Sequence, residues 1–400
     1  MITYPDKKLI LITIVLLSCF CVSGCWDLTE INSIATPVNI GFELDRDGKI
    51  NFSTLFSQSK VAGESGRIQT TLFVTGASDY SVSMAGRRQM LFLPRVPDWS
   101  NVQGIILGEN IAQNGLPRVI DFLIRNRRII PRSEVFVAAG STPEELLDHI
   151  YLTSKENIDQ LILINELLTG TYVPVSKDDF IYKLMTPGIE PAVPRLSLIE
   201  FPYNPDRLNS EEKKSHIGTT RIVLNGMAVF KGSKMVGSLD EYESRGYRWL
   251  QPSINRGGLL IIKSPFNSAE DINLEIESFK CKTVPQVNGN NISMLLNIKV
   301  RFNFYETTRP GIIFDQHIEN ALKKAVEVEV SRQIGSCIQK SQTLNSDIPG
   351  WGRILESKHP EEWKRLKSNW NNIYPFIKAD IRVYADINHT YLSKGTVKLR

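Results

Sequence analysis

Histidines, cysteines and long apolar runs are scarce in this chain, and each scarcity excludes a class of function. The sequence has 400 residues, of which 5 are histidines, far apart from one another, and 5 are cysteines. It contains no H-E-x-x-H, C-x-x-C, Walker-loop or G-x-S-x-G motif. We therefore expect no metal site, no cofactor and no catalytic group of these common kinds.

Charge and length bound the remaining possibilities. The formal net charge is +4, which is too small for a nucleic-acid-binding surface. No apolar run after position 25 approaches the ~18 residues that a membrane-spanning helix needs. A chain of this length exceeds one typical hydrophobic core, so we predict two or three domains.

The N-terminal stretch is typical of a targeting signal. Lys7 and Lys8 form a positive region, and Leu9 to Val22 is an almost unbroken apolar run. As a helix this run would be about 21 Å long at ~1.5 Å per residue, shorter than the ~30 Å hydrocarbon core of a bilayer. It is therefore the apolar region of a signal peptide and not a membrane span.

The end of this signal has the pattern of a bacterial lipobox. An aliphatic residue, two small residues and a cysteine occur in order as Val22-Ser23-Gly24-Cys25. This pattern predicts a diacylglycerol on the Cys25 thiol and removal of residues 1–24. Two acyl chains are sufficient to anchor a protein stably at the outer face of a membrane. The alternatives are a plain signal peptide with a chance cysteine and a retained signal anchor.

Two cysteines, Cys281 and Cys337, remain in the exported portion. Export permits a disulfide between them. Cys337, however, shares the apolar side of a predicted helix with Leu322, Val326 and Val330. This position favours a buried free thiol.

Hydrophobic periodicity predicts an α+β fold with mixed or antiparallel sheets and packed helices. Period-two alternation predicts strands at Ile34–Leu44 and Ile292–Phe304, and a long helix is expected over 318–341. We place an N-terminal α+β domain at 25–200, a middle hairpin region at 201–270 and a C-terminal α+β domain at 271–400. The C-terminal order is β-β-α-α-β.

Local signals refine this division. Thr142, Pro143 and Glu145 form the pattern of a helix-capping box. We predict a mobile loop over 59–67 and a helix that begins at a Ser78 cap.

Several weak motifs have both functional and structural interpretations. The S-x-x-K spacing of Ser57 and Lys60, and of Ser210 and Lys213, occurs in some acyl-transfer enzymes, but S-D-N and K-T-G do not accompany it. Arg256-Gly257-Gly258 is typical of either a plain turn or a phosphate-binding loop. A basic cluster is either a solvated face or a partner contact, and it consists of Arg125, Arg127, Arg128 and Arg132. An aromatic stripe, which we interpret as core, consists of Trp363, Leu366, Trp370 and Ile373.

Four segments, taken in order, resemble the Ger(x)C family, the lipoprotein C subunits of spore germinant receptors. They are Gly24-Cys25-Trp26-Asp27 with Glu30-Ile31-Asn32; Leu107-Gly108-Glu109-Asn110-Ile111-Ala112 with Gly115-Leu116 and 121–125; Gly226-Met227-Ala228-Val229-Phe230-Lys231 with 234–237; and Asp347-Ile348-Pro349-Gly350-Trp351-Gly352 with His359-Pro360, Trp363-Lys364 and Trp370. The sequence departs from the family pattern at Leu28-Thr29 and at 348–350.

The resemblance implies a non-enzymatic receptor subunit with three α+β domains. It implies attachment to the outer face of the spore inner membrane through lipid on Cys25, and action with two integral membrane subunits, A and B, in the response to nutrient germinants. An alternative function is an envelope solute-binding lipoprotein that serves a transporter. That function requires two doubly wound lobes, which the C-terminal strand order argues against. A lipid-anchored hydrolase using Ser57 and Lys60 is a third possibility.

Overall fold

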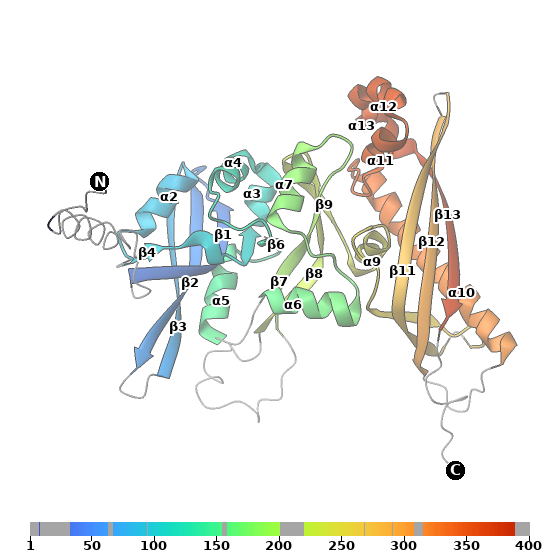
Figure 1. The fold of residues 1–400 in the computed structure, drawn as a ribbon, viewed down its shortest axis with the longest axis horizontal. Coiled ribbons are helices and arrows are strands. Elements are labelled where there is room, and N and C mark those ends of the chain that lie inside the picture. The colour runs from blue at the N-terminus through green and yellow to red at the C-terminus, as the bar shows by residue number, and fades with distance from the viewer. Residues whose placement is uncertain are drawn as a thin grey trace, which may run out of the picture.

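The fold is built on two separate β-sheets with helices packed around and between them. The computed structural model describes Lys8 and residues 33–388, apart from 63–66, 94, 154–157, 201–219, 268, 290 and 308–314. Figure 1 shows the first sheet at one end of an elongated molecule and the second sheet, with its long helix, at the other.

The first sheet mixes antiparallel and parallel pairing. Its order is β3-β2-β1-β5-β6-β7-β8-β9, with β4 paired to β1. Three neighbouring pairs, β1·β5, β5·β6 and β6·β7, are parallel. The strands are β1 (Ile34–Leu44), β2 (Ile50–Ala62), β3 (Arg67–Asp79), β4 (Val96–Pro97), β5 (Gly104–Leu107), β6 (Glu134–Ala138), β7 (Ala192–Glu200), β8 (Thr220–Lys231) and β9 (Lys234–Leu239).

Helices cover both faces of this sheet. Ile105 and Leu107 belong to one buried cluster and Ile106 to the other, because successive residues of a strand face opposite sides. Strand β5 is therefore buried throughout, as expected for a central parallel strand. The helices are α2 (Val82–Gln89), α3 (Glu109–Asn114), α4 (Pro117–Arg125), α5 (Pro143–Thr153), α6 (Ile158–Ile164), which continues into the turn η3 (Asn165–Thr169), and α7 (Lys177–Met185).

The second sheet has the order β10-β11-β12-β13. It consists of β10 (Leu259–Lys263), β11 (Asp271–Asn288), β12 (Asn291–Thr307) and β13 (Lys378–Ile387). The α10 helix (Gln316–Thr343) covers it through a buried row that includes Leu322, Val326, Val330 and Ile334. Between the two sheets lies α9 (Glu241–Trp249), which packs on α10.

Three short helices lie between α10 and β13. They are α11 (Trp351–Lys358), α12 (Pro360–Leu366) and α13 (Trp370–Ile373). Trp363 and Trp370 are buried and meet edge to face, with ring centroids 5.2 Å apart. The interpretation of this aromatic stripe as core is confirmed.

The predicted α+β class is confirmed, as is the capping box of α5. The Thr142 amide donates to Glu145 Oε2 at 2.7 Å, and the Glu145 amide donates to Thr142 Oγ1 at 3.2 Å. Two local predictions are wrong. The loop over 59–67 is too long, because β2 continues to Ala62 and β3 begins at Arg67, and Ser78 lies in β3. Pairing with β2 keeps Ser78 in the strand, and the expected helix begins instead at Val82, with Ser81 at its N-cap position.

The division at 25–200, 201–270 and 271–400 stays a prediction. The first sheet itself continues across position 200, because β7 pairs with β8 from Ala192↔Val229 to Glu200↔Thr220. The parallel run through β1, β5, β6 and β7 is a feature that the sequence patterns did not indicate.

Candidate functional site

The predicted lipidation site, Cys25, lies outside the described residues, as do Gly24 and the rest of the first family-like segment. Within the part of the chain that the structure describes, no helix is long and apolar enough to cross a membrane. The other three family-like segments are all described, and two of them meet.

The third and fourth segments form a joint between the two sheets. We use the name sheet joint for residues 188–191, 226–237 and 344–352. Ser346 Oγ donates to the carbonyl oxygen of Phe230 at 2.5 Å. The Glu190 amide donates to the Asp347 carbonyl oxygen at 2.9 Å, and the Phe230 amide donates to that of Pro191 at 3.0 Å. The contacts of Ser346 and Asp347 fix the segment after α10 to the end of β8 and to the segment before β7.

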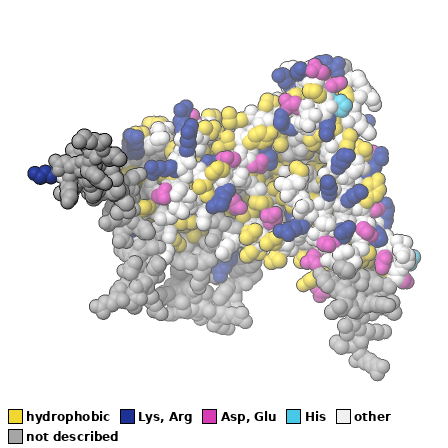
Figure 2. All heavy atoms as spheres, viewed as in Figure 1, with side chains coloured by type: hydrophobic (Ala, Val, Ile, Leu, Met, Phe, Trp, Pro, Cys, Tyr) yellow, Lys and Arg dark blue, Asp and Glu magenta, His cyan; other side chains and the backbone are white. Residues whose placement is uncertain are grey.

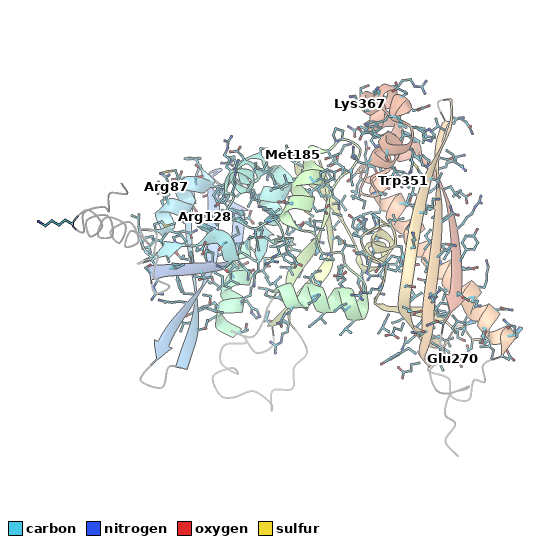
Figure 3. The ribbon with its side chains drawn as sticks, in the orientation of Figure 1. Arg87, Arg128, Met185, Glu270, Trp351 and Lys367 are labelled. Carbon is cyan, nitrogen blue, oxygen red and sulfur yellow. The ribbon has the colours of Figure 1, made fainter. Side chains whose placement is uncertain are left out.

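Asp347 is the buried carboxylate at the centre of the sheet joint. Its oxygens accept hydrogen bonds from the Trp351 amide at 2.8 Å, the Gly352 amide at 2.9 Å and Trp370 Nε1 at 2.9 Å. Burial raises the pKa of Asp347 to about 6, although these hydrogen bonds act to lower it. Asp347 therefore holds in place the α13 tryptophan and the start of α11, where Trp351 lies (Figure 3).

Glu190 is a second carboxyl group in the same joint. Its Oε2 atom accepts from the Gly232 amide at 2.8 Å. Burial raises the pKa of Glu190 to about 7, and the charge of Asp347 raises it further while that of Lys231 lowers it. The pair thus titrates near neutral pH. Sequence reasoning missed Glu190, which no motif marked.

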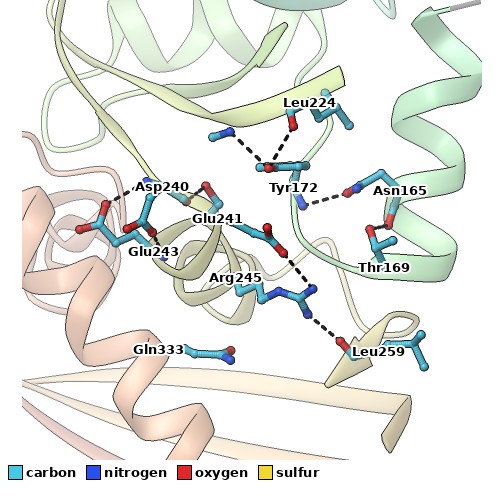
Figure 4. Close-up of polar contacts among 12 residues, drawn as sticks. Asn165, Thr169, Tyr172, Leu224, Asp240, Glu241, Glu243, Arg245, Leu259 and Gln333 are labelled. Atoms are coloured by element: carbon cyan, nitrogen blue, oxygen red, sulfur yellow. Dashed lines mark hydrogen bonds and ion pairs between the residues drawn. The ribbon is translucent and has the colours of Figure 1, made fainter. Parts of the chain in front are cut away.

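The α9 helix bridges the two sheets through polar contacts (Figure 4). Arg245 donates from Nη1 to the carbonyl oxygen of Leu259 on β10 at 2.6 Å, and its Nη2 lies 3.4 Å from Glu241 Oε1. Tyr172 Oη donates to the Leu224 carbonyl oxygen at 3.2 Å and accepts from the Gly226 amide at 3.3 Å. Arg245 thus joins α9 to the second sheet, and Tyr172 joins the segment that follows η3 to the first sheet.

A further junction joins η3 to the loop before β10. The Gly257 amide donates to the Ile276 carbonyl oxygen at 3.1 Å, and the Gly258 amide donates to that of Leu167 at 3.2 Å. Both amides are thus occupied within the chain. The turn interpretation of Arg256-Gly257-Gly258 is confirmed over the phosphate-binding one.

Arg248 lies inside this junction and is only 2 % exposed. Its Nη2 atom donates to the carbonyl oxygens of Arg256 at 2.7 Å and of Glu166 at 3.3 Å, and its guanidinium lies 5.3 Å from the centroid of the Phe279 ring. Burial lowers the pKa of Arg248 to about 10, so the group remains charged at neutral pH.

The second family-like segment has a structural role at the start of α3. Glu43 Oε1 accepts from the Ile111 amide at 3.3 Å and thereby caps the helix. A β-carbon on Gly108 would collide with the Glu43 carboxylate. Asn110 Nδ2 donates to the Leu44 carbonyl oxygen at 2.7 Å, which ties the helix to the end of β1.

The structure does not bring the candidate Ser–Lys pairs together among its described side chains. Ser57 lies in β2, and the Lys60 side chain lies outside the described part of the structure. Ser210 and Lys213 lie outside the described residues. The described part of the chain contains no group of three or more metal-ligating side chains.

The two cysteines of the predicted exported portion are free thiols. Cys337 is buried under α9, and Cys281 is half-buried on β11. The preference for free thiols over a disulfide is confirmed.

The predicted basic cluster does not form one surface. Arg125 pairs with Asp121 at 2.9 Å and lines a cleft between α2 and α4, whereas Arg132 lines a different cleft of about 720 Å³ near the sheet joint. Arg127 and Arg128 are exposed. Figure 2 likewise shows basic and acidic side chains interspersed over the visible face.

The described residues therefore define an α+β protein whose family-like segments build contacts between its parts. Comparison with known proteins agrees. A family model described as "Spore germination protein N-terminal domain" matches residues 27–198, and one described as "Spore germination B3/ GerAC like, C-terminal" matches 225–391. The chain belongs to the Ger(x)C family.

Full-length relatives and a solved structure support this assignment. The chain is 22% identical over 407 residues to spore germination protein KC of Bacillus subtilis (strain 168) and 25% identical over 424 residues to spore germination protein YndF of the same strain, covering 98% of both chains in each case. The crystal structure of the GerBC protein aligns with a TM-score of 0.55 at 15% identity, covering 87% of this chain and 96% of that chain. This last likeness concerns the fold. The family assigns the chain a role in spore germination.

Proposed function

We propose that this protein is the lipid-anchored, non-enzymatic C subunit of a nutrient germinant receptor. It acts with integral membrane A and B subunits at the outer face of the spore inner membrane. The observation that carries the proposal is the lipobox ending at Cys25, two residues before the first family match begins. A diacylglycerol on that thiol anchors the rest of the chain to the membrane through its N-terminus.

The structure described here supports a scaffold role. The family-like segments at Asp347 and Phe230 are occupied by contacts between the two sheets, and the Gly108 segment by contacts between α3 and β1. Such contacts fix the relative positions of distant surfaces, which a subunit that transmits a signal between partners requires.

Spores that lack the gene test this function directly. The loss of optical density is followed after single nutrients and after dodecylamine, a trigger that bypasses the receptors. We expect failure with one nutrient class and a normal dodecylamine response. A normal response to every nutrient, together with no A- or B-type protein in affinity-purified complexes, would contradict the proposal.

A Cys25→Ala variant tests the anchor separately. We expect it to lose diacylglycerol, as seen by mass spectrometry of the N-terminal peptide, and to restore nutrient germination poorly. A Cys281→Ala variant is the matched control, because that thiol is half-buried and lies far from the signal. Full germination with unlipidated protein would exclude the tether mechanism.

A further inference from the structure

Two large apolar side chains project into solvent directly after α2. Leu91 is 80% exposed and Phe92 is 75% exposed, and Met90 beside them is 37% exposed. We call residues 90–92 the apolar tip. Single exposed leucines are common on protein surfaces, but an adjacent pair this exposed marks a contact surface.

The apolar tip is anchored on both sides. Gln89 is 1% exposed, and its Nε2 atom donates to the Phe52 carbonyl oxygen at 2.5 Å. Leu93, which is 9% exposed, packs against Ala35 and Phe56 in a small buried cluster. Because Gln89 and Leu93 are both buried, they hold Leu91 and Phe92 in their exposed positions.

The backbone of the tip is already hydrogen-bonded. The amides of Met90, Leu91 and Phe92 donate to the carbonyl oxygens three residues earlier, at 3.0, 3.1 and 3.1 Å. Transfer of an unpaired amide into a bilayer costs several kcal/mol, as does transfer of any unsatisfied backbone group. These three amides avoid that cost.

Two arginines lie in a cleft beside the tip. Arg87 and Arg118 line a cleft of about 520 Å³ that also includes Met90. Arg118 donates to the carbonyl oxygens of Gly48 and Tyr80, both at 3.0 Å, so its charge is not neutralised. Figure 3 places Arg87 on α2, at the exposed side of the first sheet. Two nearby arginines are paired with acids, Arg88 with Asp79 and Arg125 with Asp121.

The tip also lies close to the first residues of the sheet. Strand β4 pairs in parallel with the start of β1, at Ile34↔Val96 and Ala35↔Pro97. Eight residues lie between Cys25 and Ile34, and the nine Cα-to-Cα steps from one to the other reach at most about 30 Å. A lipid on Cys25 therefore keeps α2 and β4, at the end of the molecule away from β13, near the bilayer (Figure 1).

We infer that the apolar tip is a second membrane contact, in which Leu91 and Phe92 enter the interfacial region of an anionic bilayer and Arg87 and Arg118 face lipid phosphates. This inference rests on the proposed lipid at Cys25. A stable protein–protein contact buries about 800 Å² per partner, more than a three-residue tip provides. Shallow insertion of a few apolar side chains beside basic residues is sufficient at a membrane interface.

An environment-sensitive fluorophore on a single cysteine tests the contact. Phe92→Cys is labelled in the full processed chain carrying Cys281→Ser, and Phe376→Cys is the matched control, since Phe376 is an aromatic residue with 82% exposure. The lipidated proteins are placed on vesicles of phosphatidylcholine with or without phosphatidylglycerol. We expect blue-shifted emission at position 92, and severalfold stronger quenching by acyl-chain spin labels than at position 376.

Charge is tested in the same assay. Arg87→Gln with Arg118→Gln removes the phosphate-facing groups, and we expect the signal at position 92 to lose its dependence on phosphatidylglycerol. Arg332→Gln, on the exposed side of α10, is expected to leave that dependence unchanged.

Each outcome decides a different point. Lipidated protein whose probe at position 92 is as water-exposed as that at 376 overturns this inference and leaves the anchor standing. Protection that requires co-reconstituted A and B subunits identifies a protein contact and overturns the membrane assignment. A Cys25 peptide without diacylglycerol overturns the proposed anchor and, with it, this inference.

Discussion

Gly352 and Gly188 pack backbone against backbone in the sheet joint. A β-carbon on Gly352 would lie 2.5 Å from the Cα atom of Gly188, closer than real β-carbons approach backbone. Because neither partner is a flexible side chain, α11 must shift to admit even one methyl group. The start of α11 therefore lies against the segment before β7 at a distance that only glycine permits.

Gly352→Ala should accordingly destabilise the protein by about 2 kcal/mol, the usual cost of overpacking. Alanine would otherwise favour the helix by up to about 1 kcal/mol over glycine. Gly335→Ala is the control, because Gly335 lies in α10 with open space around its β position. Thermal unfolding should show a lower melting temperature for the first variant and an equal or higher one for the second. A Gly352→Ala protein as stable as Gly335→Ala would exclude the close approach.

The second prediction concerns pH. The pKa of Glu190 is raised by burial from 4.5 to about 7. Between these values the folded state binds more protons than the unfolded state, so stability is highest below pH 4.5 and declines as pH rises through 7. Glu190→Gln removes this loss of stability, because glutamine does not ionise. Its amide oxygen still accepts a hydrogen bond from the Gly232 amide. At pH 8 the variant should be more stable than the wild type, by about 3 kcal/mol.

Melting temperatures measured from pH 5 to pH 8 check the sign of this effect. The difference between variant and wild type should grow with pH, and at pH 5 it should be about a quarter of its value at pH 8. Glu361→Gln, at an exposed position on α12, should show no such trend. Parallel curves for Glu190→Gln and the wild type would contradict the assignment.

The third prediction concerns Arg248. Its removal leaves the carbonyl oxygens of Arg256 and Glu166 without their donor, at about 1–3 kcal/mol for each buried unsatisfied group. Arg248→Ala should lower the melting temperature by several degrees. Arg332→Ala should change it little, because the Arg332 side chain is 66% exposed. Equal effects of the two substitutions would argue against the η3 junction.

Thiol reactivity gives a fourth prediction. Burial raises the pKa of the Cys337 thiol strongly and that of Cys281 more modestly, so both carry little reactive thiolate at neutral pH. Under native conditions a maleimide should label Cys281 slowly and Cys337 not at all, and both should react in urea. Peptide mass spectrometry measures the labelled fraction of each thiol. A disulfide-linked peptide pair from non-reduced protein would contradict the free-thiol state.

The sequence was sufficient where structure follows from nearby residues. Alternation over Ile292–Phe304 indicated β12, and the Thr142 pattern indicated the start of α5. The sequence patterns did not predict contacts between residues that are distant along the chain. The parallel run from β1 to β7 depends on crossovers through several helices, and α9 has a polar sequence whose burial arises from packing on α10 and on nearby strands.

The candidate sites divide in the same way. The lipobox at Cys25 is a local pattern, readable without any structure. Asp347 lay in a recognised segment, but its role required knowledge of what surrounds it. Glu190 and Glu43 lie in no motif, because each is defined by a backbone amide distant in the sequence.

The pairing of β13 with β12 sets an order of events during folding. Met294 pairs with Ala379, so α10 and three shorter helices must be traversed before this parallel ladder can close. The hairpin of β11 and β12 is local by comparison and forms without that delay. Until residues 378–387 arrive, β12 presents an unpaired edge, which is a template for mispairing with other chains. The newly synthesised protein is thus most vulnerable to aggregation in the interval before its last described strand is added.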